Sequence, residues 1–339
     1  MKFLRLLLFP FAIIYDLITR IRNYFFDSGI FKSTSFTIPV IVVGNLSVGG
    51  TGKTPQIEYL IRLLKNKFEV AVLSRGYKRK TEGFVLLDKK HKAIDVGDEP
   101  LQYFKKFDAI SVAVDANRVN GIHQLISQKS TEVILLDDAF QHRKVKANFY
   151  ILLTKYNDLY VDDFLLPSGN LRESKSGAKR ANVILVTKCP SNLSIIEQQK
   201  ITKKINSNKN QNVFFTSISY ANNLKGSLDI LISNLIAYEV LLITGIANPN
   251  PLLEFLSSKN ISFEHLKFAD HHHFSDEEIK HIKSEFEEIK SKNKLILTTE
   301  KDYVRLSEKL ENLSYLEIET QFLEHQSQKF DELILNSLN

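Results

Sequence analysis

The residues best suited to chemistry are concentrated in one stretch, IVVGNLSVGGTGKTP, at positions 41–55. Its glycines let a backbone turn N–H groups toward phosphate, Lys53 would reach the β- and γ-phosphates, and the Thr54 hydroxyl would bind Mg²⁺. The stretch departs from the G-x-x-x-x-G-K-[ST] pattern only at Ser47, where that pattern has its first glycine. A serine supplies the same N–H group provided that its φ is negative. We therefore predict a nucleoside-triphosphate loop made of Gly44, Asn45, Ser47, Val48, Gly49, Gly50, Thr51, Gly52, Lys53 and Thr54.

An acidic motif, VILLDD at positions 133–138, complements this loop. In phosphate-loop folds an aspartate at the end of a hydrophobic strand holds Mg²⁺ or its water. Asp137 and Asp138 would point to opposite faces if the strand continued, so we expect only one of them to touch a metal directly. The alternative is that the pair caps a helix.

The elements that must position these groups alternate along the first half of the chain. Short β-branched runs, apolar on both faces, are each followed by a turn and a helical pattern. This alternation predicts a doubly wound, mostly parallel α/β sheet of the P-loop NTPase kind. The predicted strands are 38–44, 70–76, 109–114, 133–138, 149–154 and 183–188.

A polar stretch rich in Asn and Lys, at 191–212, separates this region from a second, smaller set of strands. We predict three parts: an N-terminal segment 1–30, a P-loop domain 31–210 and a smaller α/β domain 211–339. The strands of the second set are predicted at 213–218, 240–245, 263–268, 294–302 and 314–319.

The N-terminal segment combines apolar side chains with positive charge. Its uncharged run, from Leu6 to Tyr15, is shorter than the roughly 20 residues that a membrane-spanning helix needs. We expect a basic amphipathic helix that lies in a membrane interface. The alternative is a helix packed on the protein's own core, with its arginines solvated.

The net charge and the cysteine count limit which binding partners and which covalent or metal sites the chain can have. A net charge of +6 suits nucleic acid, anionic lipid or a phosphorylated small molecule, and composition does not choose among them. The single cysteine, Cys189, excludes an intramolecular disulfide and a cysteine metal cage. No Arg/Lys stripe with interleaved aromatic residues is present, which disfavours a nucleic-acid-binding ATPase.

Six further motifs follow one another in a characteristic order. They are SRGY (74–77), VGDEP (96–100), DDAFQHR (137–143), LLPSGNLRE (165–173), FADHHHF (268–274) and TTEKD (298–302). With the basic apolar start and the loop GNLSVGGTGKT, they resemble the tetraacyldisaccharide 4'-kinase family, the lipid A 4'-kinases of Gram-negative bacteria. The resemblance covers nearly the whole chain and makes Ser47 the family's own variant of the loop.

The resemblance implies a function and a location. It implies transfer of the γ-phosphate of ATP, with Mg²⁺, to the 4'-hydroxyl of a tetraacyldisaccharide 1-phosphate. It also implies two α/β domains with a cleft between them, and peripheral attachment to the cytoplasmic face of the inner membrane. The expected partners are the lipid substrate and the membrane surface, with no nucleic acid and no obligate protein partner. A membrane-associated ATPase switch is the competing hypothesis.

The resemblance also implies roles for single residues. Asp98 would take the proton of the sugar hydroxyl, supported by His271 or the adjacent His272, and Lys53 would neutralise phosphate charge. Glu99 is an alternative base in the same turn. The residues expected to neutralise or line the phosphate are Arg118, Gln141, His142 and Arg172. The residues expected at the metal are Thr54, Asp138 and Glu173.

Several local patterns carry weaker interpretations. Ala139 and Lys78 stand where the family has glycine, and a positive φ at Ala139 would cost about 1 kcal/mol. The adjacent histidines of DHHH cannot easily converge on one zinc ion. VTK at 186–188 lacks the aspartate of a guanine-reading motif. EKD at 300–302 is either a solvated strand end or a contact to nucleotide or hinge.

Overall fold

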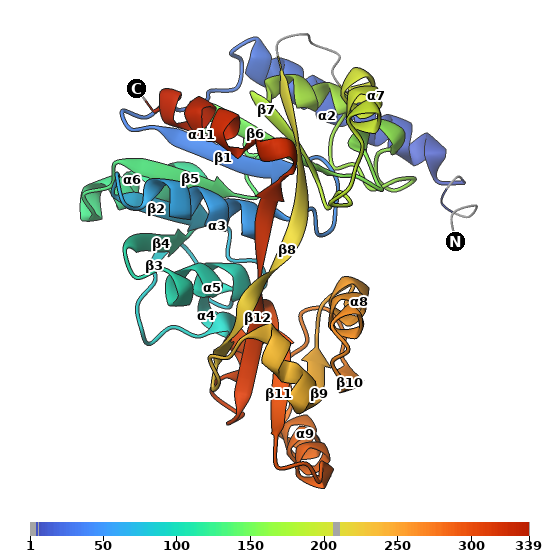
Figure 1. Cartoon of the computed structure of the whole chain (residues 1–339). Coiled ribbons are helices and arrows are strands. Elements are labelled where there is room, and N and C mark those ends of the chain that lie inside the picture. Colours follow the sequence, from blue (N-terminus) through green and yellow to red (C-terminus); the bar gives the residue numbers. More distant parts are fainter. Residues whose placement is uncertain (1–4, 6, 206–210, 339) are drawn as a thin grey trace.

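One mixed sheet runs through both lobes of the computed structural model (Figure 1). The structure describes residues 5, 7–205 and 211–338. Within these residues the sheet has 12 strands in the order β10-β9-β11-β12-β8-β7-β6-β1-β5-β2-β4-β3. A mixed α/β fold with a large, mostly parallel sheet is therefore confirmed.

The first lobe contains β1 to β7, which pair in parallel except for the edge strand β3. Side chains of β1 alternate between two cores, with Val40 and Val42 on one face and Ile41 and Val43 on the other. This burial on both faces is why the runs are apolar throughout. All six strands predicted here are present. The strands are β1 Val40–Asn45, β2 Val70–Ser74, β3 Val85–Leu86, β4 Ile110–Val114, β5 Val133–Asp137, β6 Phe149–Lys155 and β7 Val183–Thr187.

Helices cover both faces of this part of the sheet. Helix α3 buries Ile57, Leu60, Ile61 and Leu64, the face that its sequence spacing predicts. The helices are α3 Lys53–Leu64, α4 Ala93–Val96, α5 Asp98–Lys106, α6 Arg118–Gln128 and α7 Ile195–Ile205, with 3-10 turns at Tyr160–Asp162 and Lys175–Arg180.

The second lobe is a smaller α/β unit around the parallel strands β9, β10 and β11. The predicted strand 294–302 is too long, because β11 ends at Thr299 and the Thr299 side chain accepts a hydrogen bond from the Asp302 N–H to start helix α10. The elements are a 3-10 turn Ile232–Ala237, β9 Glu239–Thr244, α8 Asn250–Ser258, β10 Phe263–Lys267, α9 Asp276–Glu288, β11 Lys294–Thr299 and α10 Glu300–Leu306.

Two long strands, β8 Asn212–Gly226 and β12 Leu313–Phe322, connect the lobes (Figure 1). Strand β8 begins in parallel with β7 and continues in antiparallel pairing with β12. After the 3-10 turn Leu323–His325, helix α11 Ser327–Asn336 returns to the first lobe. There Phe330 and Ile334 share a core with residues of α3. The stretch predicted as a polar boundary contains α7, and residues 206–210 lie outside the described residues; the division at residue 210 stays a prediction.

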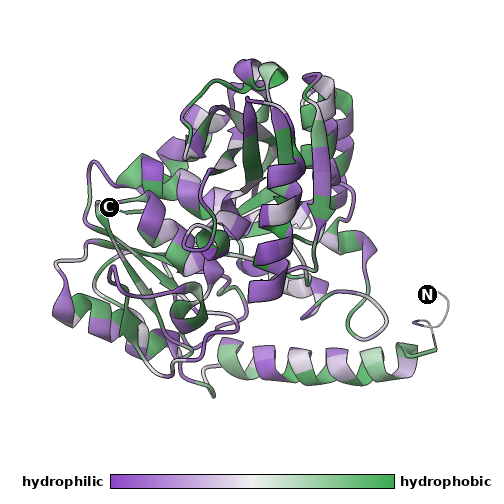
Figure 2. Ribbon diagram, turned by 90° about the horizontal axis from the view of Figure 1, so that it is seen from below, coloured by the Kyte–Doolittle hydropathy of each residue, from purple (hydrophilic) through white to green (hydrophobic). Residues whose placement is uncertain are grey.

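The N-terminal helix α2, Phe9–Asp27, lies along an edge of the molecule (Figure 2). Its buried side chains are the small or polar Ala12, Thr19 and Asn23. The alternative interpretation required α2 to bury an apolar face in the protein's own core. The helix does not bury such a face. Lys2, part of the predicted basic segment, lies outside the described residues. No described helix is long and apolar enough to cross a membrane. The large apolar side chains exposed on α2 are Phe9, Phe11, Ile13, Ile14, Leu17, Ile18, Ile21 and Tyr24.

Candidate active site

The phosphate loop leads from β1 into α3 with glycine where the backbone needs it. Gly49 and Gly52 have φ of 101° and 86°, values that favour glycine. Ser47 is not among the described residues with positive φ, so its side chain is compatible with the loop. Gly44 is needed for space, because a Cβ there would lie 2.7 Å from the Phe140 Cβ and 2.9 Å from its backbone nitrogen.

Neighbouring residues brace the loop. Asn45 Nδ2 donates to Thr51 Oγ1 at 2.9 Å, and Thr187 Oγ1 donates to the Thr51 carbonyl at 2.8 Å. The VTK motif thus supports the backbone of the loop through Thr187. The Val48 N–H is already bound, since it donates to the Asn170 carbonyl at 2.8 Å.

Lys53 and Arg172, which the sequence analysis places at the phosphates, both contact Asp138, which it places at the metal. Arg172 donates to Asp138 through Nη1 at 3.2 Å and Nη2 at 2.9 Å. Lys53 Nζ lies 3.6 Å from Asp138 Oδ1. Burial would raise the pKa of Asp138, but Lys53 and Arg172 outweigh burial and lower it. The structure therefore brings the loop lysine, Asp138 and Arg172 together.

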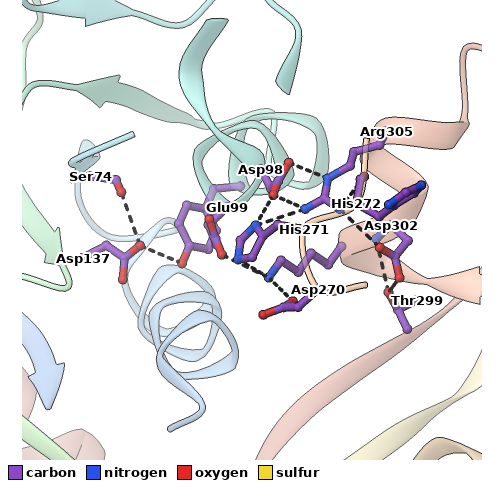
Figure 3. A network of polar contacts seen from close by, with 12 residues as sticks. Ser74, Asp98, Glu99, Asp137, Asp270, His271, His272, Thr299, Asp302 and Arg305 are labelled. Carbon is purple, nitrogen blue, oxygen red and sulfur yellow. Dashed lines mark hydrogen bonds and ion pairs between the residues drawn. The ribbon is translucent and has the colours of Figure 1, made fainter. Parts of the chain in front are cut away.

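Asp137, the last residue of β5, is buried behind the loop (Figure 3). Its Oδ2 accepts from Ser74 Oγ at 3.5 Å and from the Tyr103 hydroxyl at 3.4 Å. Its buried Oδ1 has no hydrogen-bond partner in the described part of the chain. Burial, and then the charge of Asp138, raises the pKa of Asp137 to about 7.

Glu173 connects the N-terminal helix to the loop. Its Oε1 accepts from Arg180 at 2.8 Å and Gln141 at 3.0 Å, and its Oε2 accepts from Asn23 of α2 at 3.0 Å. Gln141 also donates to the Asn45 carbonyl at 2.8 Å. Among the described residues, no group of three His, Cys, Asp or Glu side chains is arranged to hold a metal ion.

Arg118 is buried near Asp137 and Asp138, and His142 is half-buried near Arg118. Arg118 donates to the Asp115 carbonyl at 2.7 Å. Burial lowers the pKa of Arg118 to about 10, with Asp137 and Asp138 opposing that shift. Burial, and then the charge of Arg118, lowers the pKa of His142 to about 4. At neutral pH His142 therefore offers hydrogen bonds rather than positive charge.

The Asp98 carboxylate meets a histidine from the other lobe. Asp98 is the first residue of α5, and His271 follows β10 in a loop where its φ is 58°. His271 Nδ1 lies 2.8 Å from Asp98 Oδ2 (Figure 3). The adjacent His272 instead contacts Glu278 at 2.8 Å. Of the two histidines, His271 is the one beside Asp98.

Two residues that the sequence analysis missed complete this group. Arg305 Nε donates to Asp98 Oδ1 at 2.8 Å, and Lys301 Nζ lies 2.9 Å from His271 Nε2. Lys301 is also 3.6 Å from Glu99, the alternative base. The signal was present, because Lys301 and Arg305 are four positions apart and share one face of a helix. This helical spacing was overlooked because TTEKD was predicted to be the end of a strand.

The remaining residues of EKD are structural. Asp302 accepts from the Gly245 N–H and the Thr299 hydroxyl, both at 2.8 Å. Glu300 lies 2.8 Å from Lys106 of the first lobe. The motif is therefore not a solvated strand end, and it contacts residues on both lobes.

A cavity of about 800 Å³ opens between α2 and the DDAFQHR loop. Arg22 of α2 forms part of its wall and donates to the Gln141 carbonyl at 2.8 Å. The wall combines aromatic and basic side chains, which suits a ligand with apolar and anionic parts. Residues that line it include Arg22, Phe26, Phe31, His142, Arg143 and Lys144.

Of the two positions where the family has glycine, Lys78 adopts a positive φ and Ala139 does not. Asp138, not Ala139, has a φ of 49°, so the alanine that replaces a family glycine causes no strain of that kind. Lys78 does adopt a positive φ, of 60°. The lysine thus occupies a backbone position that favours glycine.

Known proteins match this chain over nearly its whole length. The family model described as tetraacyldisaccharide-1-P 4'-kinase matches residues 4–339. The tetraacyldisaccharide 4'-kinase of Flavobacterium johnsoniae is 58% identical, over 99% of this chain and 97% of its own. That of Bacteroides thetaiotaomicron is 47% identical, over 97% of this chain and 92% of its own.

A solved structure shows the same architecture. The crystal structure described as the "apo" form of LpxK from Aquifex aeolicus in complex with ATP superposes with a TM-score of 0.80 at 30% identity. The match covers 99% of this chain and 100% of that chain. With the family model and the sequence relatives, it shows that this chain belongs to the tetraacyldisaccharide 4'-kinase family, the kinases of lipid A biosynthesis.

Proposed function

We propose that this protein transfers the γ-phosphate of ATP to the 4'-hydroxyl of tetraacyldisaccharide 1-phosphate. The observation that carries the proposal is that helix α5 links a candidate base to the phosphate loop. The helix begins at Asp98. Tyr103, roughly 7.5 Å farther along the helix axis, donates to Asp137 behind the loop at 3.4 Å. Gln102 of the same helix donates at 2.8 Å to Glu58 of α3, the helix that the loop enters. One rigid element thus holds Asp98 and the loop at a fixed separation.

The chain's own residues have distinct tasks in this reaction. As the sugar oxygen bonds to the γ-phosphorus, its proton passes to Asp98, and the bond from the γ-phosphorus to the bridging oxygen breaks to leave ADP. Lys53 and Arg172 neutralise charge on the phosphates. Both cations contact Asp138 in the structure, so we infer that they exchange this carboxylate for phosphate when ATP binds.

Mg²⁺ fits the residues behind the loop. The buried Oδ1 of Asp137 has no partner among the described residues, and its raised pKa marks a carboxylate that a cation would stabilise. We therefore place Asp137 with Thr54 and Asp138 in the candidate metal set. Glu173 already accepts three hydrogen bonds, so we assign it to holding α2. When bound, the ion would neutralise charge on the phosphate oxygens.

The acceptor would bind beside α2. The cavity there offers Phe26 and Phe31 for apolar contact, and Arg22 and Arg143 for an anionic group. The exposed apolar side of α2 would lie in a membrane interface, next to a substrate whose acyl chains are in the same lipid layer. We place the protein on the cytoplasmic face of the inner membrane; the exposed apolar side of α2 and the relatives in Gram-negative bacteria support peripheral attachment.

The test is direct. The purified full-length protein is incubated with Mg²⁺, γ-labelled ATP and a tetraacyldisaccharide 1-phosphate in detergent, and label at the 4' position is measured. Lys53→Ala should abolish transfer. Asp98→Asn should lower turnover on the order of 100-fold or more while ATP binding persists.

Controls separate the parts of the proposal. Lys283→Met removes an exposed charge from α9 and should leave transfer unchanged. ATP binding without label in lipid, across detergents and acyl lengths, would refute the acceptor assignment and favour the ATPase switch. Full turnover of Asp98→Asn would remove Asp98 from its role.

A further inference from the structure

Four side chains form a continuous row in which Asp98 is the only member from the first lobe. Arg305 contacts Asp98, Asp98 contacts His271, and His271 contacts Lys301. Arg305 and Lys301 come from helix α10 of the second lobe. Figure 3 shows Arg305 beside Asp98. The side chains of Asp98 and Arg305 are 10% and 5% exposed, so water contributes little to their hydrogen bonding.

Lys301 determines which nitrogen of His271 carries the proton. A lysine ammonium group only donates, so His271 Nε2, 2.9 Å from Lys301 Nζ, must accept. The ring hydrogen is then on Nδ1, where it is donated to Asp98 Oδ2 at 2.8 Å. The opposite tautomer would place an N–H group against the ammonium, and a charged imidazolium would add repulsion to that conflict.

Arg305 determines which oxygen of Asp98 stays available. Its Nε donates to Oδ1 at 2.8 Å, and its Nη2 donates to Oδ2. The same Nη2 lies 3.2 Å from His271 Nδ1, so these two N–H groups converge on Oδ2. Oδ2 also accepts from His271, so both of its lone pairs are used, whereas Oδ1 has one donor and one lone pair left. Burial would raise the pKa of Asp98, but hydrogen bonds from Arg305 and His271 outweigh it and hold the pKa well below its usual range.

The charges around this row are mixed. Lys301 lies 3.6 Å from both Glu99 and Asp270, and Arg305 lies 3.6 Å from Asp302. The ring of Tyr77 packs edge-on against His271 with centroids 5.7 Å apart. These acidic neighbours stabilise the two cations in place, which keeps both donors directed at His271 and Asp98.

We propose that Lys301 and Arg305 are positioning residues for phosphoryl transfer, acting through His271 and Asp98. Lys301 fixes the neutral, Nδ1-protonated tautomer of His271, and Arg305 orients the carboxylate so that Oδ1 is the atom that receives the proton of the sugar hydroxyl. The proposal rests on the proposed function. The chemical balance is unchanged: the proton moves from the hydroxyl to Asp98 Oδ1 while phosphate moves to the sugar oxygen.

Nuclear magnetic resonance tests the tautomer without substrate. Long-range ¹H–¹⁵N spectra of the full-length protein, with His271→Gln used to assign the signal, should show the Nδ1-protonated form of His271. Lys301→Met should convert that signal to a mixture of tautomers, and the control Lys283→Met should not. An Nε2-protonated ring in the unmutated protein would overturn the role of Lys301. This measurement stands even if the lipid acceptor is wrong.

Kinetics test the positioning role. Arg305→Met should lower kcat on the order of 100-fold, the range of a lost acid–base contribution, with the KM for ATP within about two-fold. Arg305→Lys should recover only part of kcat, because lysine cannot form the two-point contact. Lys301→Met should lower kcat roughly 10-fold.

The alternative is a purely structural role, which predicts a different pattern. Under that alternative, Arg305→Met would lower thermal stability and ATP binding together, and Arg305→Lys would restore kcat in proportion to folded protein. Either of these results, or an unchanged kcat in Arg305→Met, would overturn the proposal. Loss of label transfer in the unmutated protein would instead refute the proposed function.

Discussion

Lys106 of α5 and Glu300 of α10 form a buried polar contact that joins the two lobes, with Nζ and Oε1 2.8 Å apart. The same Nζ lies 2.7 Å from Glu58 of α3 and 3.3 Å from Glu317 of β12. One lysine therefore compensates carboxylates from three elements. Since α3 follows the phosphate loop and α5 begins at Asp98, this cluster holds the loop and Asp98 in a fixed relative position.

Lys106→Met should destabilise the protein strongly. Removing one partner of a buried ion pair leaves uncompensated charge and costs about 3–5 kcal/mol. Here the lysine side chain is 9% exposed and that of Glu58 is 1% exposed, so water cannot replace the lost contact. Urea unfolding should show the loss, and Lys105→Met, an exposed change on the same helix, should stay within about 0.5 kcal/mol. A loss as small as that control would mean that the carboxylates are already protonated.

Glu300 should make stability depend on pH. Burial, and then the charge of Glu58, raises the pKa of Glu300 to about 8. The folded state then binds a proton that the unfolded state has released, so stability falls as pH rises from about 4.5 to about 8. Glu300→Gln should flatten that part of the profile relative to Glu288→Gln, an exposed control on α9. Parallel slopes in the two variants would contradict the assignment to Glu300.

Asp137 should control the pH dependence of metal-assisted nucleotide binding. Its pKa is raised to about 7, so the carboxylate that a cation needs is mostly protonated at pH 6 and mostly ionised at pH 8. We expect Mg²⁺ to strengthen ATP binding more at pH 8 than at pH 6, measured by calorimetry. Asp137→Asn should lose that difference, while Asp108→Asn, an exposed control, keeps it. A Mg²⁺ effect independent of pH in the unmutated protein would exclude Asp137 from the metal set.

Substitution should cost much more stability at Gly44 than at Ser47. Gly44→Ala places a Cβ 2.7 Å from Phe140, which forces the DDAFQHR loop away and costs about 1–3 kcal/mol. Ser47→Gly removes a side chain from a position without positive φ, so its effect should be under about 1 kcal/mol. Thermal unfolding and ATP affinity check both. Equal losses would show that the serine side chain itself is required.

The sequence predicted what depends on local patterns. The strands around β1 and the phosphate loop follow from short-range spacing and propensity. It missed contacts between distant segments, such as Arg305 with Asp98, because nothing local indicates which helix face meets a loop from the other lobe. It also mistook the start of α10 for a strand end, because Thr299 serves both as the last strand residue and as a cap.

The exposed apolar side of α2 should bind lipid without supporting the fold. Ile14 and Ile18 are each 57% exposed, so replacing both with Gln removes apolar surface that contacts little of the protein. We expect weaker sedimentation with anionic phospholipid vesicles and unchanged thermal stability. By contrast, Asn23→Ala breaks the hydrogen bond to Glu173 and should loosen the attachment of α2 to the loop, which lowers stability by about 1 kcal/mol. Unchanged vesicle binding in the double variant, with ATP binding intact, would show that α2 does not carry membrane attachment.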